Sequence, residues 1–69
     1  MSFKIETVNH VNRLTVGQIL FQDEIERFII KKIKREYFIL ENEQDNFRVK
    51  IILRYNLLND GWHTEIGSS

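Results

Sequence analysis

Six cationic residues stand near aromatic ones in the middle of the sequence: Lys31, Lys32, Lys34, Arg35, Arg48 and Lys50. Tyr37 and Phe38 follow the first four after one intervening residue, Glu36. Small β proteins use cations beside aromatic rings to follow phosphates and stack bases, so this pattern indicates weak, sequence-tolerant nucleic-acid binding. Acidic neighbours allow another interpretation, in which the charges are solvated surface and the lysines keep an edge strand from pairing with other molecules.

Aromatic side chains indicate a second kind of binding surface. The sequence has five Phe, two Tyr and one Trp, and a chain this small cannot place all of them inside. Exposed aromatic residues commonly anchor a protein partner. The candidates for such a protein-binding site are Phe3, Tyr37, Tyr55 and Trp62. The alternative is that Trp62 and most of the Phe residues fill the core.

The other reactive side chains form no catalytic or metal-binding pattern. His10 and His63 are far apart in the sequence, and the absence of Cys excludes a disulfide, a thiolate zinc site and a cysteine nucleophile. The acidic residues at 23–26 lack the ligand spacing and central Gly of a calcium loop. The three Gly are scattered, so no phosphate-binding loop is expected. We therefore expect no enzymatic activity and no cofactor.

Length and charge limit the protein to one small domain. A chain of 69 residues has room for a single hydrophobic core, and 42% hydrophobic residues argue against disorder. Lys plus Arg and Asp plus Glu both number 10, so no net field draws the protein to nucleic acid or to an acidic membrane. No segment approaches the roughly 20 apolar residues of a membrane span, and no signal peptide is evident. We expect a cytoplasmic protein without a membrane partner.

Two patterns predict that most of the chain forms strands: apolar and polar residues alternate in 3–8 and 47–53, and Ile, Phe and Tyr are frequent in 27–33 and 37–42. The expected strands cover 3–8, 14–21, 27–33, 37–42, 47–53 and 62–66. The clearest alternation lies after residue 46, where Phe47, Val49 and Ile51 share one face, and we expect this strand to be central. Gly17 predicts a bulge or a sharp bend. Residues 54–60 are expected to form a short helical turn that Gly61 ends in the left-handed conformation.

The segment 21–40 also has a helical interpretation. Its apolar residues fall at helical spacing, which predicts an α+β fold with one long helix on a small antiparallel sheet. We favour strands because Ile, Phe and Tyr are mildly disfavoured in helices. In addition, three β-rich segments follow one another at about ten-residue spacing.

The order of parts resembles that of an SH3-like small barrel over residues 14–66. The resemblance rests on Leu14 to Gln18 entering a strand, the hairpin strands that follow, and the turn from Leu57 to Gly61 before a last strand. It implies a mainly β, partly open barrel of about five strands, with 1–13 as an opening strand or arm and 67–69 as a loose tail. Barrels of this kind bind peptides, nucleic acids or proteins and are rarely enzymes.

The function predicted from these features is protein–protein interaction. A tiny neutral chain without catalytic groups is typical of phage or mobile-element accessory proteins that dock on a larger host protein and modulate it. The alternative is nucleic-acid binding through the basic hairpin at 31–35. An open sheet edge would also allow a homo-oligomer to form.

Overall fold

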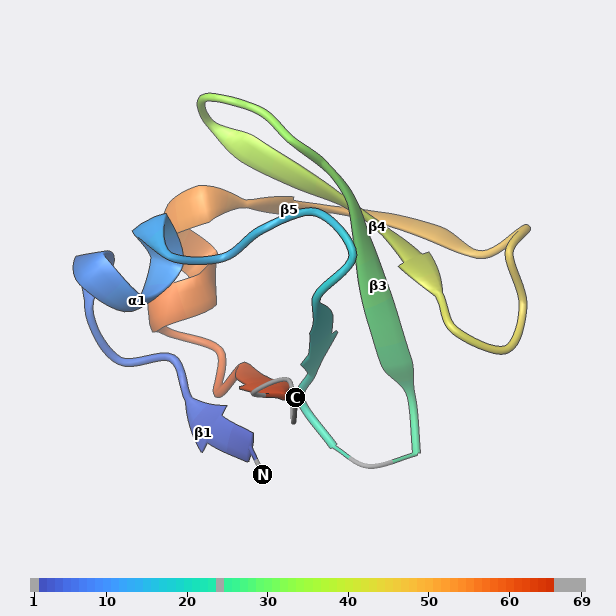
Figure 1. The fold of residues 1–69 in the computed structure, drawn as a ribbon, viewed down its shortest axis with the longest axis horizontal. Helices are drawn as coiled ribbons and strands as arrows, with labels where there is room; N and C mark the ends of the chain where they lie inside the picture. Colours follow the sequence, from blue (N-terminus) through green and yellow to red (C-terminus); the bar gives the residue numbers. More distant parts are fainter. Residues whose placement is uncertain (1, 24, 66–69) are drawn as a thin grey trace.

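The computed structural model describes residues 2–23 and 25–65, and this part of the chain is mainly β (Figure 1). The strands are β1 (Ser2–Lys4), β2 (Ile19–Phe21), β3 (Arg27–Ile33), β4 (Tyr37–Asn42), β5 (Val49–Leu53) and β6 (His63–Glu65). They form one antiparallel sheet in the order β1-β6-β2-β3-β4-β5. Two short helices complete this part, the α-helix α1 (Val8–Asn12) and the 3₁₀-helix η1 (Arg54–Leu58). The prediction of a mainly β fold is confirmed.

The alternative of one long helix over 21–40 is wrong. This segment contains the last residue of β2 and most of the hairpin of β3 and β4, whose turn is closed by the Lys34 N–H donating to the Tyr37 carbonyl at 2.9 Å. A bulge between Ile30 and Lys32 shifts the register of the hairpin. The stiff β-branched and aromatic side chains of this segment pack well on a pleated surface, which favours strands over a helix.

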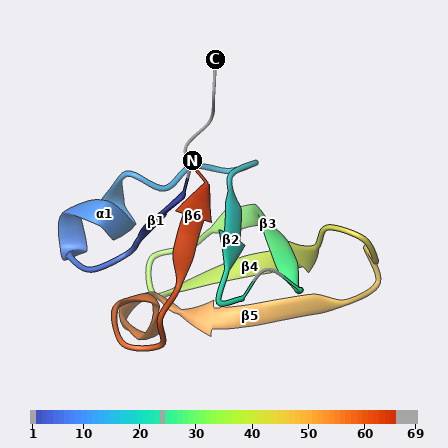
Figure 2. The same ribbon diagram turned by 90° about the horizontal axis from the view of Figure 1, so that it is seen from below.

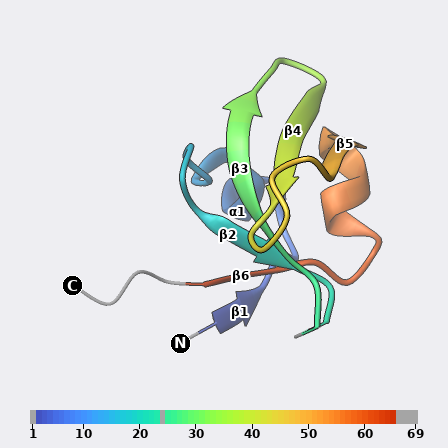
Figure 3. The same ribbon diagram turned by 90° about the vertical axis from the view of Figure 1, so that its right-hand side faces the viewer.

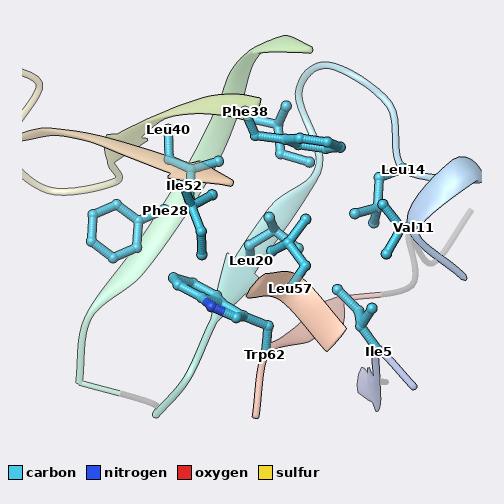
Figure 4. Close-up of a cluster of buried hydrophobic side chains, with 11 residues drawn as sticks. Ile5, Val11, Leu14, Leu20, Phe28, Phe38, Leu40, Ile52, Leu57 and Trp62 are labelled. Carbon is cyan, nitrogen blue, oxygen red and sulfur yellow. The ribbon is translucent and has the colours of Figure 1, made fainter. Parts of the chain in front are cut away.

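The sheet curves around one core. Figure 3 shows β1 and β6 running across the direction of β3 and β4, and the side chains in Figure 4 fill the space inside this curve. The core residues are Ile5, Val11, Leu14, Leu20, Phe28, Ile30, Phe38, Leu40, Ile52, Leu57 and Trp62. Leu20, Phe38 and Leu40 are fully buried, so the centres of β2 and β4 anchor the domain.

The first third of the chain departs from the expected strands. β1 and β2 are each only three residues long, and α1 lies within 1–13, the part of the chain expected to be an opening strand or arm. Thr7 begins this helix because its side chain accepts a hydrogen bond from the His10 N–H at 3.2 Å. Val11 then fixes α1 on the core, being 3% exposed. Gly17 lies in a turn outside any strand, with φ 96°, and its N–H donates to the Ile30 carbonyl.

β5 lies at the edge of the sheet, so the prediction of a central strand is wrong. Figure 2 shows it along one border, next to β4. Ile52 faces the core and is 6% exposed, whereas Val49 and Ile51 on the opposite face are 57% and 66% exposed. An alternating pattern identifies two faces but does not determine which of them meets the core. In β5 the charged face turns inward, where the Lys50 ammonium lies 5.4 Å from the Trp62 ring centroid.

The turn after η1 confirms the expected role of Gly61. Its φ is 75°, in the left-handed region that costs other L-residues about 1–2 kcal/mol. We therefore expect Gly61→Ala to lower the free energy of unfolding by about 1–2 kcal/mol, measured by urea denaturation. Gly61→Asn should cost less because Asn visits this region more readily. If Gly61→Ala and Gly61→Asn lowered the free energy of unfolding equally, the positive φ of Gly61 would not be the cause.

Candidate functional site

An apolar groove opens between α1, η1, the end of β5 and the β3–β4 turn. Its volume is about 420 Å³, within the usual range for a binding pocket. It is lined by Val8, Val11, Arg35, Glu36, Leu53, Arg54, Tyr55 and Leu58. Figure 1 shows the two helices that form its walls lying against each other. Val8 and Tyr55 are 60% and 64% exposed, so the groove presents large apolar groups to solvent.

Arg54 holds the charged rim of the groove in place. Its Nη2 donates to the Lys34 carbonyl at 2.9 Å and its Nε to the Arg35 carbonyl at 3.1 Å. The guanidinium also lies 5.1 Å from the ring centroid of Phe38, and its Nη1 reaches Asn12 on α1. No carboxylate pairs with Arg54 among residues 2–23 and 25–65. The rim therefore carries a positioned cation whose charge is not neutralised by a described carboxylate.

A second apolar area lies on the convex side of the β4–β5 hairpin. We call it the outer patch, formed by Tyr37, Ile39, Val49, Ile51 and Leu53. The register pairs Tyr37 with Leu53 and Ile39 with Ile51, so these side chains adjoin one another on one face. Leu53, which is 47% exposed, belongs to both the outer patch and the groove. The two areas therefore meet at Leu53.

The four aromatic candidates for protein binding occupy four different environments. Tyr55 lines the groove and Tyr37 lies in the outer patch. Phe3 is half-buried on β1, where its ring meets His10 edge-on at 5.2 Å between centroids. Trp62 is 1% exposed and packs against Phe28 in the core, which corrects its placement at a partner-binding surface. The alternative, in which Trp62 fills the core, agrees with this structure.

Sequence reasoning did not find the aliphatic wall of the groove. Val8 and Val11 enter it from α1, and Leu58 enters it from η1. Residues 7–12 did contain one signal, because Thr7 followed by apolar residues at 8 and 11 is compatible with a capped helical turn. The contact between α1 and η1 joins segments more than 40 positions apart, and no local pattern predicts it.

The six cations proposed for nucleic-acid binding do not form one surface. Lys31 pairs with Glu41 at 3.8 Å, and Arg48 pairs with Glu26 at 2.7 Å. Lys50 lies over core aromatic rings. Lys32, Lys34 and Arg35 remain near the β3–β4 turn without a carboxylate partner in the described part of the chain. Arg48 is at the opposite end of the β4–β5 hairpin, so these three form the only compact group of the six.

The comparisons with known proteins give no family to which the site could be assigned. No protein-family model, no curated protein and no solved structure matches the chain significantly. The described residues contain no group of three or more His, Asp or Glu side chains that could hold a metal ion. They also contain no helix with the length and apolar character needed to cross a bilayer. The chemistry of the groove and of the outer patch is therefore the basis for assigning a function.

Proposed function

We propose that the protein is a small cytoplasmic interaction module that holds an apolar side chain of a larger protein in its groove and modulates that protein. The observation that carries the proposal is the apolar groove itself, open to solvent and walled by Val8, Leu53 and Tyr55. Exposed apolar surface of this kind marks sites that bind other molecules. A phage or mobile-element origin remains a prediction from size and composition.

An SH3-like barrel is the fold that we propose for residues 14–66. The support is the order of the parts, in which β2 to β5 follow one another in the sheet and η1 lies between β5 and β6. β6 returns to pair with β2, which brings the last strand beside the first strand of this unit. β1 is then an addition at the β6 edge, in keeping with the expected opening arm.

The rim of the groove indicates the chemistry of the partner segment. Arg35 and Arg54 supply two guanidinium groups, whereas Glu36 supplies one carboxylate. The local excess of positive charge favours a partner whose apolar residue is flanked by Asp or Glu. We therefore expect a segment with one large apolar side chain and at least one neighbouring acidic residue.

Selection from a displayed library of random peptides tests this proposal. The wild-type protein should enrich peptides that combine a large apolar residue with adjacent acids, and their affinity should fall as salt increases. Val8→Asp should reduce binding of an enriched peptide at least tenfold, because it places a negative charge at the groove, where the acidic and apolar residues of the peptide would bind. An acid in the first turn of a helix is favourable, so α1 should remain folded.

Val16→Asp is the matched control for this variant. Val16 and Val8 are both 60% exposed, but Val16 lies in a turn and does not line the groove. The control should bind the enriched peptide like the wild type. The proposal is wrong if no peptide is enriched, or if Val8→Asp and Val16→Asp bind equally well.

A further inference from the structure

We infer that two copies of the chain associate through β5, which pairs with the β5 of a second copy in antiparallel orientation with Ile51 opposite Ile51. This inference goes beyond the proposed function, because it depends on the edge of the sheet; Leu53 is the β5 residue that also lines the groove. β5 is the last strand of the described sheet, and its other side has no strand partner there. An unpaired edge with exposed apolar residues is a template for another strand.

The hydrogen-bond pattern identifies the groups that β5 offers at this edge. The Asn42 N–H donates to the Arg48 carbonyl, and the Arg54 N–H donates to the Glu36 carbonyl. Hydrogen-bonded and non-hydrogen-bonded pairs alternate in an antiparallel ladder, so Lys50 and Ile52 also direct their backbone groups to β4. The N–H and C=O groups of Val49, Ile51 and Leu53 therefore point to the open edge.

Symmetry and charge select one register for the two strands. A two-fold axis perpendicular to the sheet must place a residue opposite its own copy, since opposed residues share a face. An axis at Lys50 places two ammonium groups opposite each other, and an axis at Ile52 places Lys50 opposite Arg54. An axis at Ile51 places every β5 residue opposite a β5 residue of the second copy, and Lys50 then lies opposite Ile52 of that copy.

The selected register uses the groups that the edge leaves free. Ile51 meets Ile51, and Val49 meets Leu53 on both sides of it; each of these pairs exchanges both of its backbone hydrogen bonds. Their side chains lie in the outer patch, so Tyr37 and Ile39 extend the same apolar face in each copy. The next pair outward joins Arg48 and Arg54, whose like charges oppose the pairing; this pair lies outside β5, and Glu26 neutralises Arg48.

The opposite edge of the sheet is a poorer template. β1 has only three residues, Ser2, Phe3 and Lys4, and a Lys on a short edge strand is a feature that prevents edge pairing. β5 has five residues; it also carries an exposed lysine, Lys50, whose ammonium lies over the Trp62 and Phe28 rings, whereas the exposed Val49, Ile51 and Leu53 are uncharged. The two edges therefore differ mainly in length, and the longer β5 is the one suited to a second copy.

Sedimentation equilibrium of the full chain tests the association. The wild type should have twice the 8.4 kDa mass of the chain at high micromolar concentration. Ile51→Lys should be a monomer, since two ammonium groups would then face each other on the axis. Ile25→Lys is the matched control, because Ile25 is 90% exposed and lies outside β5, and it should remain a dimer. A monomeric wild type, or a dimeric Ile51→Lys, would overturn the inference.

Cysteine substitution tests the register, and because the sequence has no Cys, no native thiol can form a competing disulfide. Opposed residues of a hydrogen-bonded pair have Cα atoms about 5.5 Å apart, which suits a disulfide. On oxidation Ile51→Cys should link to itself. Val49→Cys and Leu53→Cys should link mainly when the two variants are mixed, because two copies of residue 49 are about 13 Å apart in this register. The register would be contradicted if Ile51→Cys formed no disulfide with its own copy. It would also be contradicted if Val49→Cys formed one with its own copy as readily as Ile51→Cys does.

The same variants separate this inference from the proposed function. Val8→Asp should remain a dimer, and Ile51→Lys should still bind an enriched peptide. Loss of peptide binding in Ile51→Lys would contradict the independence of the two sites.

Discussion

Replacing Trp62 with alanine should remove about 3–5 kcal/mol from the free energy of unfolding. The indole is 1% exposed, meets Phe28 edge-on and lies beneath the Lys50 ammonium. A domain of this length has about 3–10 kcal/mol of stability in total, so the variant should lose a large part of its stability. Far-UV circular dichroism and urea denaturation measure the effect, because the variant has no other Trp to report by fluorescence.

Tyr55→Ala is the control that separates a core role from a surface role. Tyr55 is also aromatic, but it is 64% exposed and lines the groove. Its replacement should change stability by less than about 0.5 kcal/mol and should weaken the enriched peptide severalfold. The buried role of Trp62 would be contradicted if Trp62→Ala kept wild-type stability and lost only the peptide.

The strands were predictable because their signals are local. The segments 27–33 and 37–42 are short runs rich in Ile, Phe and Tyr, and the β-branched and aromatic residues in them favour the strands β3 and β4. Gly61 was predictable for the same reason, since a turn that follows a short helix needs a residue with positive φ. These features depend on neighbours in the chain and on little else.

The orientation of β5 was not predictable, because it depends on residues far away in the sequence. Ile52 reaches the core only because two residues of β4 line the inner face of the sheet there. Phe38 lies opposite Ile52, and Leu40 lies opposite Lys50. Lys50 is accepted on that face because the rings of Trp62 and Phe28 interact favourably with a cation there. The sequence pattern alone favoured the opposite assignment, in which the apolar face covers the core.

The groove was missed because it depends on packing between short helices. α1 is too short to be stable alone and depends on the Thr7 cap and on the burial of Val11. The predicted binding residues are aromatic, whereas four of the five apolar residues that line the groove are aliphatic. The sequence indicated a larger basic surface than the fold presents, for a related reason. Two of the six cations, Lys31 and Arg48, have carboxylate partners that come close only in the folded chain.

Arg54 connects these features, and its replacement is the second change with a large expected effect. Arg54→Ala removes the hydrogen bonds to the Lys34 and Arg35 carbonyls and the contact with the Phe38 ring. Hydrogen bonds to a charged group are worth about 1.5–3 kcal/mol, so we expect a loss of that size in urea denaturation. The β3–β4 turn should loosen, and amide hydrogen exchange at Lys34 to Tyr37 should become faster.

Arg54→Lys and Arg35→Ala distinguish the two roles of this charge. Lysine keeps the charge but lacks the planar fork that reaches two carbonyls, so Arg54→Lys should lose most of the stability that Arg54→Ala loses. Arg35 is exposed, and Arg35→Ala should leave stability within about 0.5 kcal/mol of the wild type while reducing the salt dependence of peptide binding. If Arg54→Lys is as stable as the wild type, the positive charge over the Phe38 ring stabilises the β3–β4 turn, and the two hydrogen bonds of the guanidinium to the carbonyls do not. In that case the two carbonyls do not fix the guanidinium of Arg54, which is then free to move toward an acidic residue of the partner.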